Sequence, residues 1–346
     1  MSAITAQTVN DLRQRTGAGL MDCKKALTEA NGDMERAVEI LRIKGVATRN
    51  KKADRKASEG VLAVHISEDG RHATLLELNC ETDFVAKNED FLALSKDLVK
   101  QASLKGVDGL LEQPYHGDPS RKVNDFLEDQ VTKIGENLKV SRVLRFEAAG
   151  TGRVSAYVHT GAKIAVLLEL GLKSSAASSS PEVADLARNL AMQVVANNAR
   201  FVRRDEVPAD VVSKEKEIAA EFTKSEADKA IAEAQRVVED YRGQLAEQKA
   251  AGNAEAVAEL EKRIAVSEKQ AAAAEGRKKS QLSNLEKIVS GRVDKFFAEA
   301  CLLEQVYFRE TDKKISDLLA AAKARLGEEV NVVRFVRFQV GETAAE

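Results

Sequence analysis

Residues 134–147 read IGENLKVSRVLRFE, and residues 326–339 read LGEEVNVVRFVRFQ. Several residues of the first segment recur 192 positions later: Gly135, Glu136, Arg142, Arg145 and Phe146 return as Gly327, Glu328, Arg334, Arg337 and Phe338. A shorter match, LLEL, occupies 75–78 and again 167–170, which is 92 positions later. Self-similarity at a fixed spacing is the signature of a repeated structural unit. The sequence therefore predicts a core of two related units, residues 60–147 and 152–340.

Each predicted unit combines strands with helices, which makes the fold class α+β. Residues 61–66 and 73–78 flank an Asp-Gly pair, the usual turn of a β-hairpin, and residues 141–146 predict a further strand. After each LLEL segment, apolar residues recur at helical spacing: Phe91, Leu94 and Leu98 in the first unit, and Val183, Leu186 and Leu190 in the second.

The two spacings of the repeat differ by 100 residues, so the second unit must contain a large insertion. Two apolar series within it follow the alternating three- and four-residue steps of a coiled coil: Ala227, Ile231, Ala234, Val238, Tyr241 and Leu245, then Val257, Leu260, Ile264, Ser267, Ala271 and Ala274. Ala-Gly-Asn at 251–253 separates them. These series predict an inserted antiparallel coiled-coil hairpin at about 214–290, with arms on the order of 50 Å long.

The N-terminal part, residues 1–50, predicts three short helices. Thr5 is the expected N-cap of the first helix, Gly17 and Gly19 stop it, and Asn-Gly-Asp at 31–33 precedes the third. Residues 51–59 then predict a basic linker. No aromatic residue is interleaved with its cations, which favours a solvated connector over a nucleic-acid patch.

Composition excludes several classes of protein. Among 346 residues, 53 Lys and Arg balance 55 Asp and Glu, so no global positive charge attracts nucleic acid. The sequence has neither an apolar run long enough to span a bilayer nor a secretory signal, and we expect a cytoplasmic protein without membrane contact. Three widely separated cysteines (Cys23, Cys80 and Cys301) predict buried free thiols, with no disulfide or metal site.

No catalytic motif accompanies this composition. The chain lacks a phosphate-binding loop, a nucleophile elbow and a zinc-binding H-E-x-x-H, and Gly-Thr-Gly at 150–152 lacks the third glycine of a dinucleotide site. The one weak candidate is Cys80, with His72 as a nearby base, although a buried strand cysteine is favoured. We therefore predict a binding protein without a catalytic site, metal or cofactor of its own.

The strongest binding candidate is the segment 79–87, NCETDFVAK, at the end of the predicted hairpin. Thr82 is a suitable helix cap, which leaves Asp83 and Phe84 in the first helical turn. Phe84 lies seven residues before Phe91, so spacing alone favours core packing for its ring. His159 falls between two predicted strands, where spacing indicates only a loop histidine.

Long stretches of the chain resemble the elongation factor Ts family. The matching segments cover most of the chain in the family's order: LRQRTGAGLMDCKKAL at 12–27, ELNCETDFVA at 77–86, IGEN at 134–137 with its repeat near Gly327, and CLLEQ at 301–305. The resemblance implies a ubiquitin-associated-like N-terminal domain, the duplicated core and a helical hairpin. The insertion is longer, by about fifty residues, than the resemblance implies.

The resemblance also implies guanine-nucleotide exchange on elongation factor Tu during translation elongation. In this family Thr82, Asp83, Phe84 and Val85 would insert beside the magnesium and phosphate site of the partner and promote GDP release. Arg13, Leu20, Met21 and His159 would make further partner contacts. The expected partner is GDP-bound and nucleotide-free elongation factor Tu, with no direct nucleic acid contact. Homodimer formation, a scaffold function of the hairpin and a thiol enzyme centred on Cys80 remain alternatives.

Overall fold

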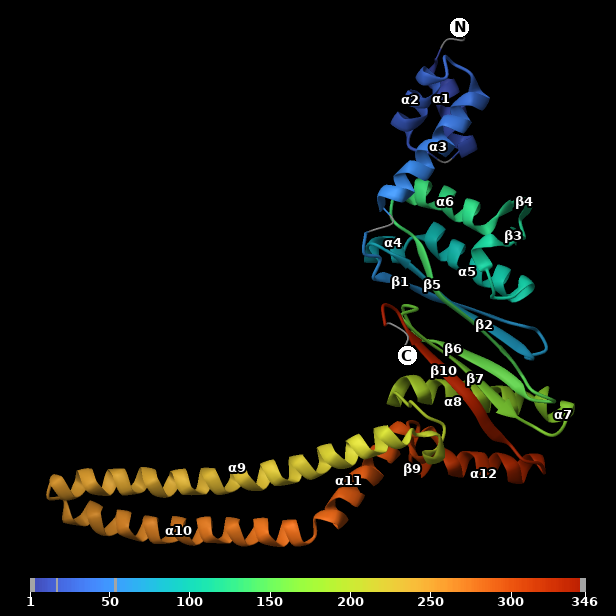
Figure 1. Ribbon diagram of the computed structural model, residues 1–346. Coiled ribbons are helices and arrows are strands. Elements are labelled where there is room, and N and C mark those ends of the chain that lie inside the picture. The colour runs from blue at the N-terminus through green and yellow to red at the C-terminus, as the bar shows by residue number, and fades with distance from the viewer. Residues whose placement is uncertain (1–3, 17, 53–54, 343–346) are drawn as a thin grey trace. The chain divides into compact units, whose positions relative to one another are not determined.

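The computed structural model describes residues 4–16, 18–52 and 55–342 (Figure 1). It divides into two compact units, one of residues 1–198 with 315–346 and one of residues 199–314. Gly17 of the predicted helix stop, and residues 53–54 of the predicted linker, lie outside the described residues.

The N-terminal part of the first unit consists of three helices, α1 (Ala6–Thr16), α2 (Leu20–Glu29) and α3 (Met34–Lys52). Leu12, Cys23 and Leu27 form the centre of their shared core. The hydroxyl of Thr5 caps α1 by accepting from the Thr8 amide at 3.2 Å, as predicted. Helix α3 continues to Lys52, beyond the start of the predicted linker at 51, because its Lys, Arg and Ala residues all favour helix.

The first α+β repeat begins with the hairpin of β1 (Glu59–Ile66) and β2 (His72–Cys80). The remaining elements follow in the order α4 (Asp83–Ala86), α5 (Glu89–Lys105), the short 3-10 helix η1 (Leu110–Glu112), β3 (Pro114–Tyr115), β4 (Asp118–Lys122), α6 (Val123–Ile134) and β5 (Lys139–Glu147). Strands β1, β2 and β5 form an antiparallel sheet with β2 in the middle, and α5 packs against it.

The second repeat has the same element order. Its parts in the first unit are β6 (Arg153–Val158), β7 (Ile164–Gly171), α7 (Ser175–Ser178), α8 (Pro181–Asn197), α12 (Ile315–Leu326) and β10 (Asn331–Gln339). Strands β6, β7 and β10 form an antiparallel sheet with β7 in the middle. Each element stands 92 or 192 positions after its counterpart, and the change from one spacing to the other falls after α8. The predicted duplication therefore extends to the small elements that carry no sequence signal.

The two sheets are packed against each other through an apolar layer that includes Leu62, Leu75, Val154 and Leu167 (Figure 1). Charged groups cross this layer in matching pairs. Arg142 donates to the buried Glu77 at 2.7 Å and covers the Phe338 ring of the other repeat, 4.0 Å from its centroid. Arg334 does the same with the buried Glu169, at 2.7 Å, and with Phe146, at 4.2 Å.

The second compact unit is mostly helical. It contains η2 (Arg204–Glu206), α9 (Ala209–Ala250), α10 (Ala254–Ser283), α11 (Leu285–Ala300), η3 (Leu302–Glu304), β8 (Val306–Tyr307) and β9 (Glu310–Lys314). Helical structure thus extends past the predicted limits of 214 and 290. The apolar series marks only the stretch where two helices face each other, whereas α11 packs back on α9.

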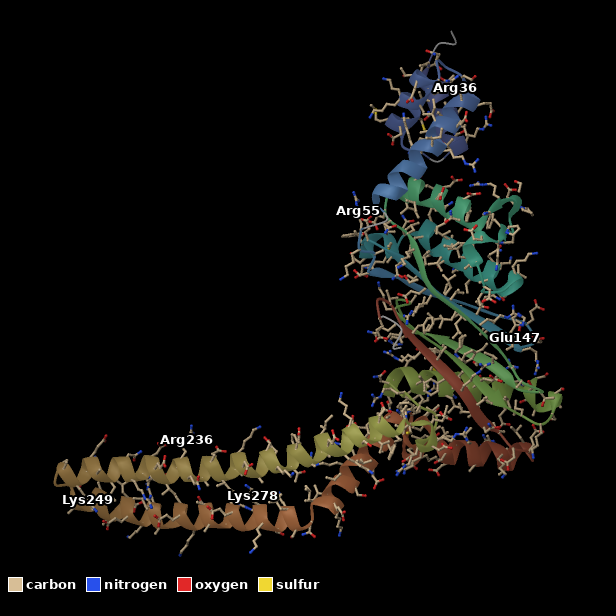
Figure 2. The ribbon with its side chains drawn as sticks, in the orientation of Figure 1. Arg36, Arg55, Glu147, Arg236, Lys249 and Lys278 are labelled. Atoms are coloured by element: carbon tan, nitrogen blue, oxygen red, sulfur yellow. The ribbon has the colours of Figure 1, made fainter. Side chains whose placement is uncertain are left out.

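Helices α9 and α10 lie side by side and are joined by the turn 251–253 (Figure 2). Every residue of the two predicted apolar series is buried or half-buried. Ion pairs connect the helices at their flanks, between Arg242 and Glu268 at 2.6 Å, between Lys249 and Glu261 at 3.1 Å, and between Lys278 and Asp228. Within the described part of the chain, no helix has the length and apolar character to cross a membrane.

Candidate functional site

The candidate site is the first corner, residues 81–86, where β2 ends and α4 begins. Thr82 is the N-cap of α4, and its hydroxyl accepts from the Val85 amide at 3.4 Å. Phe84 points outward and is 82% exposed, whereas Ala86 is buried and Val85 packs partly on the core around Phe91. The interpretation of Phe84 as a core residue is therefore wrong. The corner presents an isolated aromatic ring to solvent.

A carboxylate from the other end of the repeat fastens this corner. Glu136 accepts from the backbone amides of Glu81 and Thr82, both at 3.0 Å, and from the Thr82 hydroxyl at 2.6 Å. In return, the Glu81 carboxylate accepts from the Asn137 amide at 2.8 Å. Two segments more than fifty residues apart are thus connected by four hydrogen bonds, so the position of the Phe84 backbone is well determined.

Asp83 stands beside Phe84 on the exposed side of α4. Lys87 donates a hydrogen bond to its carboxylate at 2.7 Å, one helical turn away, and this bond lowers the pKa of Asp83. A negative charge therefore accompanies the ring at neutral pH. Both partners are exposed, so another charged molecule can compete for either of them.

His159 lies in the turn between β6 and β7, and this turn is attached to the strand end that leads to the corner. The Ala162 carbonyl accepts from the Leu62 amide at 2.8 Å, and Lys163 donates to Glu59 at 2.6 Å. Glu59 pairs with Cys80 in the sheet, directly before the corner. The structure therefore brings the His159 turn to the same end of the sheet as the corner, with the His159 side chain exposed.

Arg13, Leu20 and Met21 lie on a different part of the fold, the helices α1 and α2. All three side chains are exposed, and Leu20 and Met21 are large apolar residues at 47% and 61% exposure. They form a second candidate contact surface, separate in structure from the first corner.

The thiol alternative does not survive the geometry. His72 and Cys80 are the two ends of β2, which places them about 26 Å apart at 3.3 Å per residue. Burial raises the pKa of Cys80 to about 12, so its thiol is protonated at neutral pH. All three cysteines are buried and free, as predicted. Across residues 4–16, 18–52 and 55–342, no cluster of His, Cys, Asp and Glu has the geometry of a metal site.

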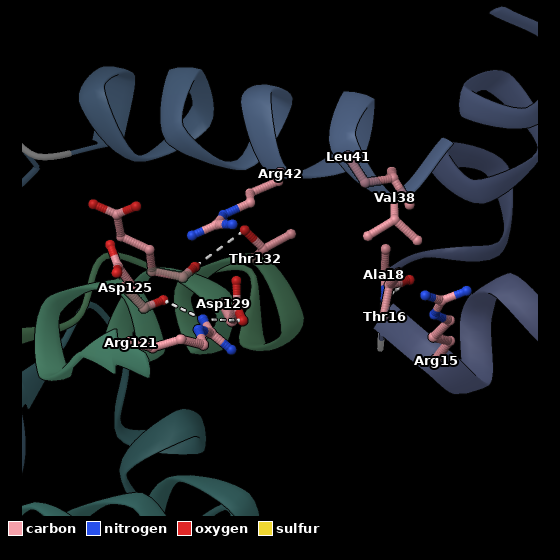
Figure 3. A pocket seen from close by; sticks show the side chains of 11 residues that line it. Arg15, Thr16, Ala18, Val38, Leu41, Arg42, Arg121, Asp125, Asp129 and Thr132 are labelled. Carbon is pink, nitrogen blue, oxygen red and sulfur yellow. Dashed lines mark hydrogen bonds and ion pairs between the residues drawn. The ribbon is translucent and has the colours of Figure 1, made fainter. Parts of the chain in front are cut away.

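A polar pocket of about 290 Å³ lies between α3 and α6 (Figure 3). Several of its charged groups are paired with neighbouring residues. Arg121 contacts Asp129 at 2.6 Å and the Asp125 carbonyl at 3.1 Å, and Arg15 pairs with Glu35 at 2.7 Å. The pocket therefore has few unpaired charges for a ligand to bind, and the first corner is the stronger candidate site.

An aromatic side chain with a neighbouring charge, exposed on a corner whose backbone is held by hydrogen bonds, is typical of a protein that acts by binding another protein. Comparison with known proteins agrees with this class. The family model described as "Elongation factor TS" matches residues 81–342. A protein named elongation factor Ts from Nostoc sp. is 38% identical over 345 residues, 99% of this chain and 94% of the relative. Those of Trichlorobacter lovleyi and Clostridium botulinum are 37% and 36% identical, over 98% of this chain and 93% of each relative. The chain belongs to the elongation factor Ts family.

Sequence reasoning missed the function of Glu136 at the corner. The available signal was its recurrence as Glu328, which indicated that both repeats need a glutamate at this position.

Proposed function

We propose that this protein is a guanine-nucleotide exchange factor that binds elongation factor Tu with GDP and promotes GDP release during translation elongation. The observation that carries the proposal is the exposure of Phe84, 82%, on a corner fixed by four hydrogen bonds. Membership of the elongation factor Ts family supplies the partner.

The mechanism follows from linkage between two binding equilibria. A protein that binds the nucleotide-free partner more tightly than the GDP-bound partner must weaken GDP by the same factor. Thr82, Asp83, Phe84 and Val85 would enter the partner next to its magnesium and phosphate site. Full burial of the Phe84 ring would contribute about 2–3 kcal/mol, and Asp83 would orient it through polar contacts.

The other parts of the chain have proposed functions in the same complex. The helices of residues 1–50 would form a ubiquitin-associated-like domain whose Arg13, Leu20 and Met21 hold the partner, and residues 51–59 would connect it to the core. His159 would add a contact from the β6–β7 turn. The helices α9 and α10 would form a coiled-coil arm. We expect the complex to act in the cytoplasm, without nucleic acid contact by this chain.

Stopped-flow release of a fluorescent GDP analogue from elongation factor Tu tests the proposal. The wild-type protein should accelerate release, and Phe84→Ala should lower that acceleration tens-fold without altering thermal unfolding, because the ring contacts solvent. Leu104→Ala is a matched control, since Leu104 is also apolar and 58% exposed but lies at the end of α5. Normal release with Phe84→Ala would refute the proposed contact.

A further inference from the structure

We infer that Glu136 is a positioning residue for the exchange reaction, because it fixes the direction in which Phe84 is presented. The inference rests on the proposed function and assigns a task to the IGEN segment at 134–137. Glu136 itself need not touch the partner. It acts through Thr82, the cap of the short helix that carries Phe84.

The position of Glu136 is set by the end of α6. Gly135 ends this helix in the left-handed conformation, with φ of 89°, which a glycine adopts without strain. The chain reverses there, and the next residue faces the corner. Gly327 ends α12 in the same way, with φ of 70°, and Glu328 follows it.

The hydrogen bonds of Glu136 determine how Thr82 acts as a cap. One carboxylate oxygen accepts from the Glu81 and Thr82 amides, and the other accepts the hydroxyl proton of Thr82. With its proton directed to Glu136, the Thr82 oxygen presents a lone pair to the Val85 amide. Glu136 therefore orients the cap, and the cap orients the single turn of α4 from which Phe84 projects.

Loss of Glu136 should change presentation more than stability. Thr82 is exposed and Glu81 is half-buried, so water can replace the lost acceptor at both amides. Water does not hold the Thr82 hydroxyl in one direction, however, and α4 is only four residues long. A helix this short cannot keep its own geometry once its cap is lost.

The second repeat supplies a natural control for this inference. Glu328 accepts from the amides of Lys173 and Ser174, at 3.1 and 3.2 Å, at the positions equivalent to Glu81 and Thr82. Ser174 caps α7 as Thr82 caps α4. The side chain presented there is that of Ala176, so the same bonds support a corner without an aromatic ring. If Glu136 and Glu328 only stabilise the fold, their loss should have equal effects. If Glu136 positions Phe84, only its loss should slow GDP release.

The test compares Glu136→Ala, Glu136→Gln and Glu328→Ala in GDP release from elongation factor Tu over a range of concentrations. Glu136→Ala should lower the maximal release rate about tenfold and change the half-saturating concentration less than about twofold. Glu136→Gln should stay close to Glu136→Ala, since its amide oxygen still accepts from both backbone amides but its NH2 group cannot accept the Thr82 hydroxyl proton. Glu328→Ala should leave the rate within about twofold of wild type. It should shift the unfolding temperature by about as much as Glu136→Ala does.

Two further measurements separate the possible failures. In the Phe84→Ala background, Glu136→Ala should have little additional effect, because the two residues act through one contact. Hydrogen exchange at the Val85 amide should accelerate in Glu136→Ala and stay unchanged in Glu328→Ala, whatever the partner does. Equal rates for the two alanine variants, or an unchanged Val85 amide, would overturn the inference. A wild-type protein that does not accelerate GDP release would instead overturn the proposed function.

Discussion

The first corner, residues 81–86, and the second corner, residues 173–178, occupy equivalent places in the two repeats. Both follow the central strand of a sheet, both begin with a capping hydroxyl, and both are fastened by a glutamate 54 or 154 positions downstream of that cap. The backbone is thus the same, and the side chains differ. The first reads Glu-Thr-Asp-Phe-Val-Ala, and the second reads Lys-Ser-Ser-Ala-Ala-Ser.

The difference shows that both repeats have the same backbone scaffold and that only the first repeat carries large side chains at its corner. Phe84 corresponds to Ala176, and Asp83 corresponds to Ser175. The first corner is also fastened more firmly. Glu81 accepts from the Asn137 amide, and its counterpart Lys173 has no acceptor on its side chain. Rigidity and an exposed ring therefore occur together at the first corner.

The strongest test of this comparison gives the first corner the side chains of the second. The triple variant Asp83→Ser, Phe84→Ala and Val85→Ala should lower the maximal rate of GDP release about a hundredfold, since it removes the whole proposed contact. The fold should persist, because α7 already has this backbone with small side chains. Circular dichroism melts check the fold, and full activity of the folded variant would show that exchange depends on another surface.

A smaller effect is expected from the charge next to the ring. Asp83→Asn should slow GDP release about fivefold, because the amide keeps the shape and loses the charge. Ser175→Ala in the second corner is the matched control and should leave the rate unchanged. Release measured at low and high salt checks the cause, since the difference between Asp83→Asn and wild type should shrink as salt rises.

Removal of the arm should matter less than either corner variant. Replacement of residues 225–282 by a short glycine-rich linker should leave GDP release within about threefold of wild type, because the bonds that fasten the first corner all lie in the first unit. Lys278 and Asp228 are in contact near the proposed cut, so a short linker can join the ends. A tens-fold loss would favour a scaffold whose functional element is the arm.

The smallest effect concerns Cys80, which lies under the first corner where the second has Leu172. Cys80→Ser should change GDP release less than twofold, because the thiol only donates to the Thr82 carbonyl, at 3.2 Å. Loss of activity in a folded Cys80→Ser protein would instead support the hypothesis of a thiol enzyme centred on Cys80.

The pH dependence of the thiol gives a second check. Its pKa is about 12 in the folded protein and about 8.5 in an unfolded chain, so the thiol stabilises the fold fully below pH 8.5. That contribution should decline as the pH rises toward 12, and chemical denaturation of wild type and Cys80→Ser at several pH values measures it. In the native protein at pH 8, a thiol reagent should label the buried Cys80 only as fast as local unfolding exposes it.

Much of the core could be predicted from the sequence, because the spacings of 92 and 192 residues apply to every element of the two repeats. The orientation of Phe84 could not. Its spacing of seven residues from Phe91 indicates a shared face only within one continuous helix. The structure has two helices there, since α4 ends before Lys87 and Asn88 caps α5 in an extended conformation. Local capping therefore overrides the periodicity.

The contacts between the two repeats could not be predicted from the sequence either. The sequence identifies Arg142 and Arg334 as equivalent residues, but it does not say that each covers the phenylalanine of the other repeat. The contact depends on how two sheets face each other, and neither the propensities nor the spacings of a strand contain that information. The same holds for Glu136, whose partners lie more than fifty residues away.

The crossed arginines have a consequence for either repeat taken alone. A solitary repeat would expose the apolar face with Leu62 and Leu75, and its Arg142 would have no aromatic ring to cover. Two identical copies related by a two-fold axis could satisfy each other by the same exchange, since the contacts are reciprocal. We therefore expect an isolated first repeat to self-associate in solution, with two copies covering each other's apolar face.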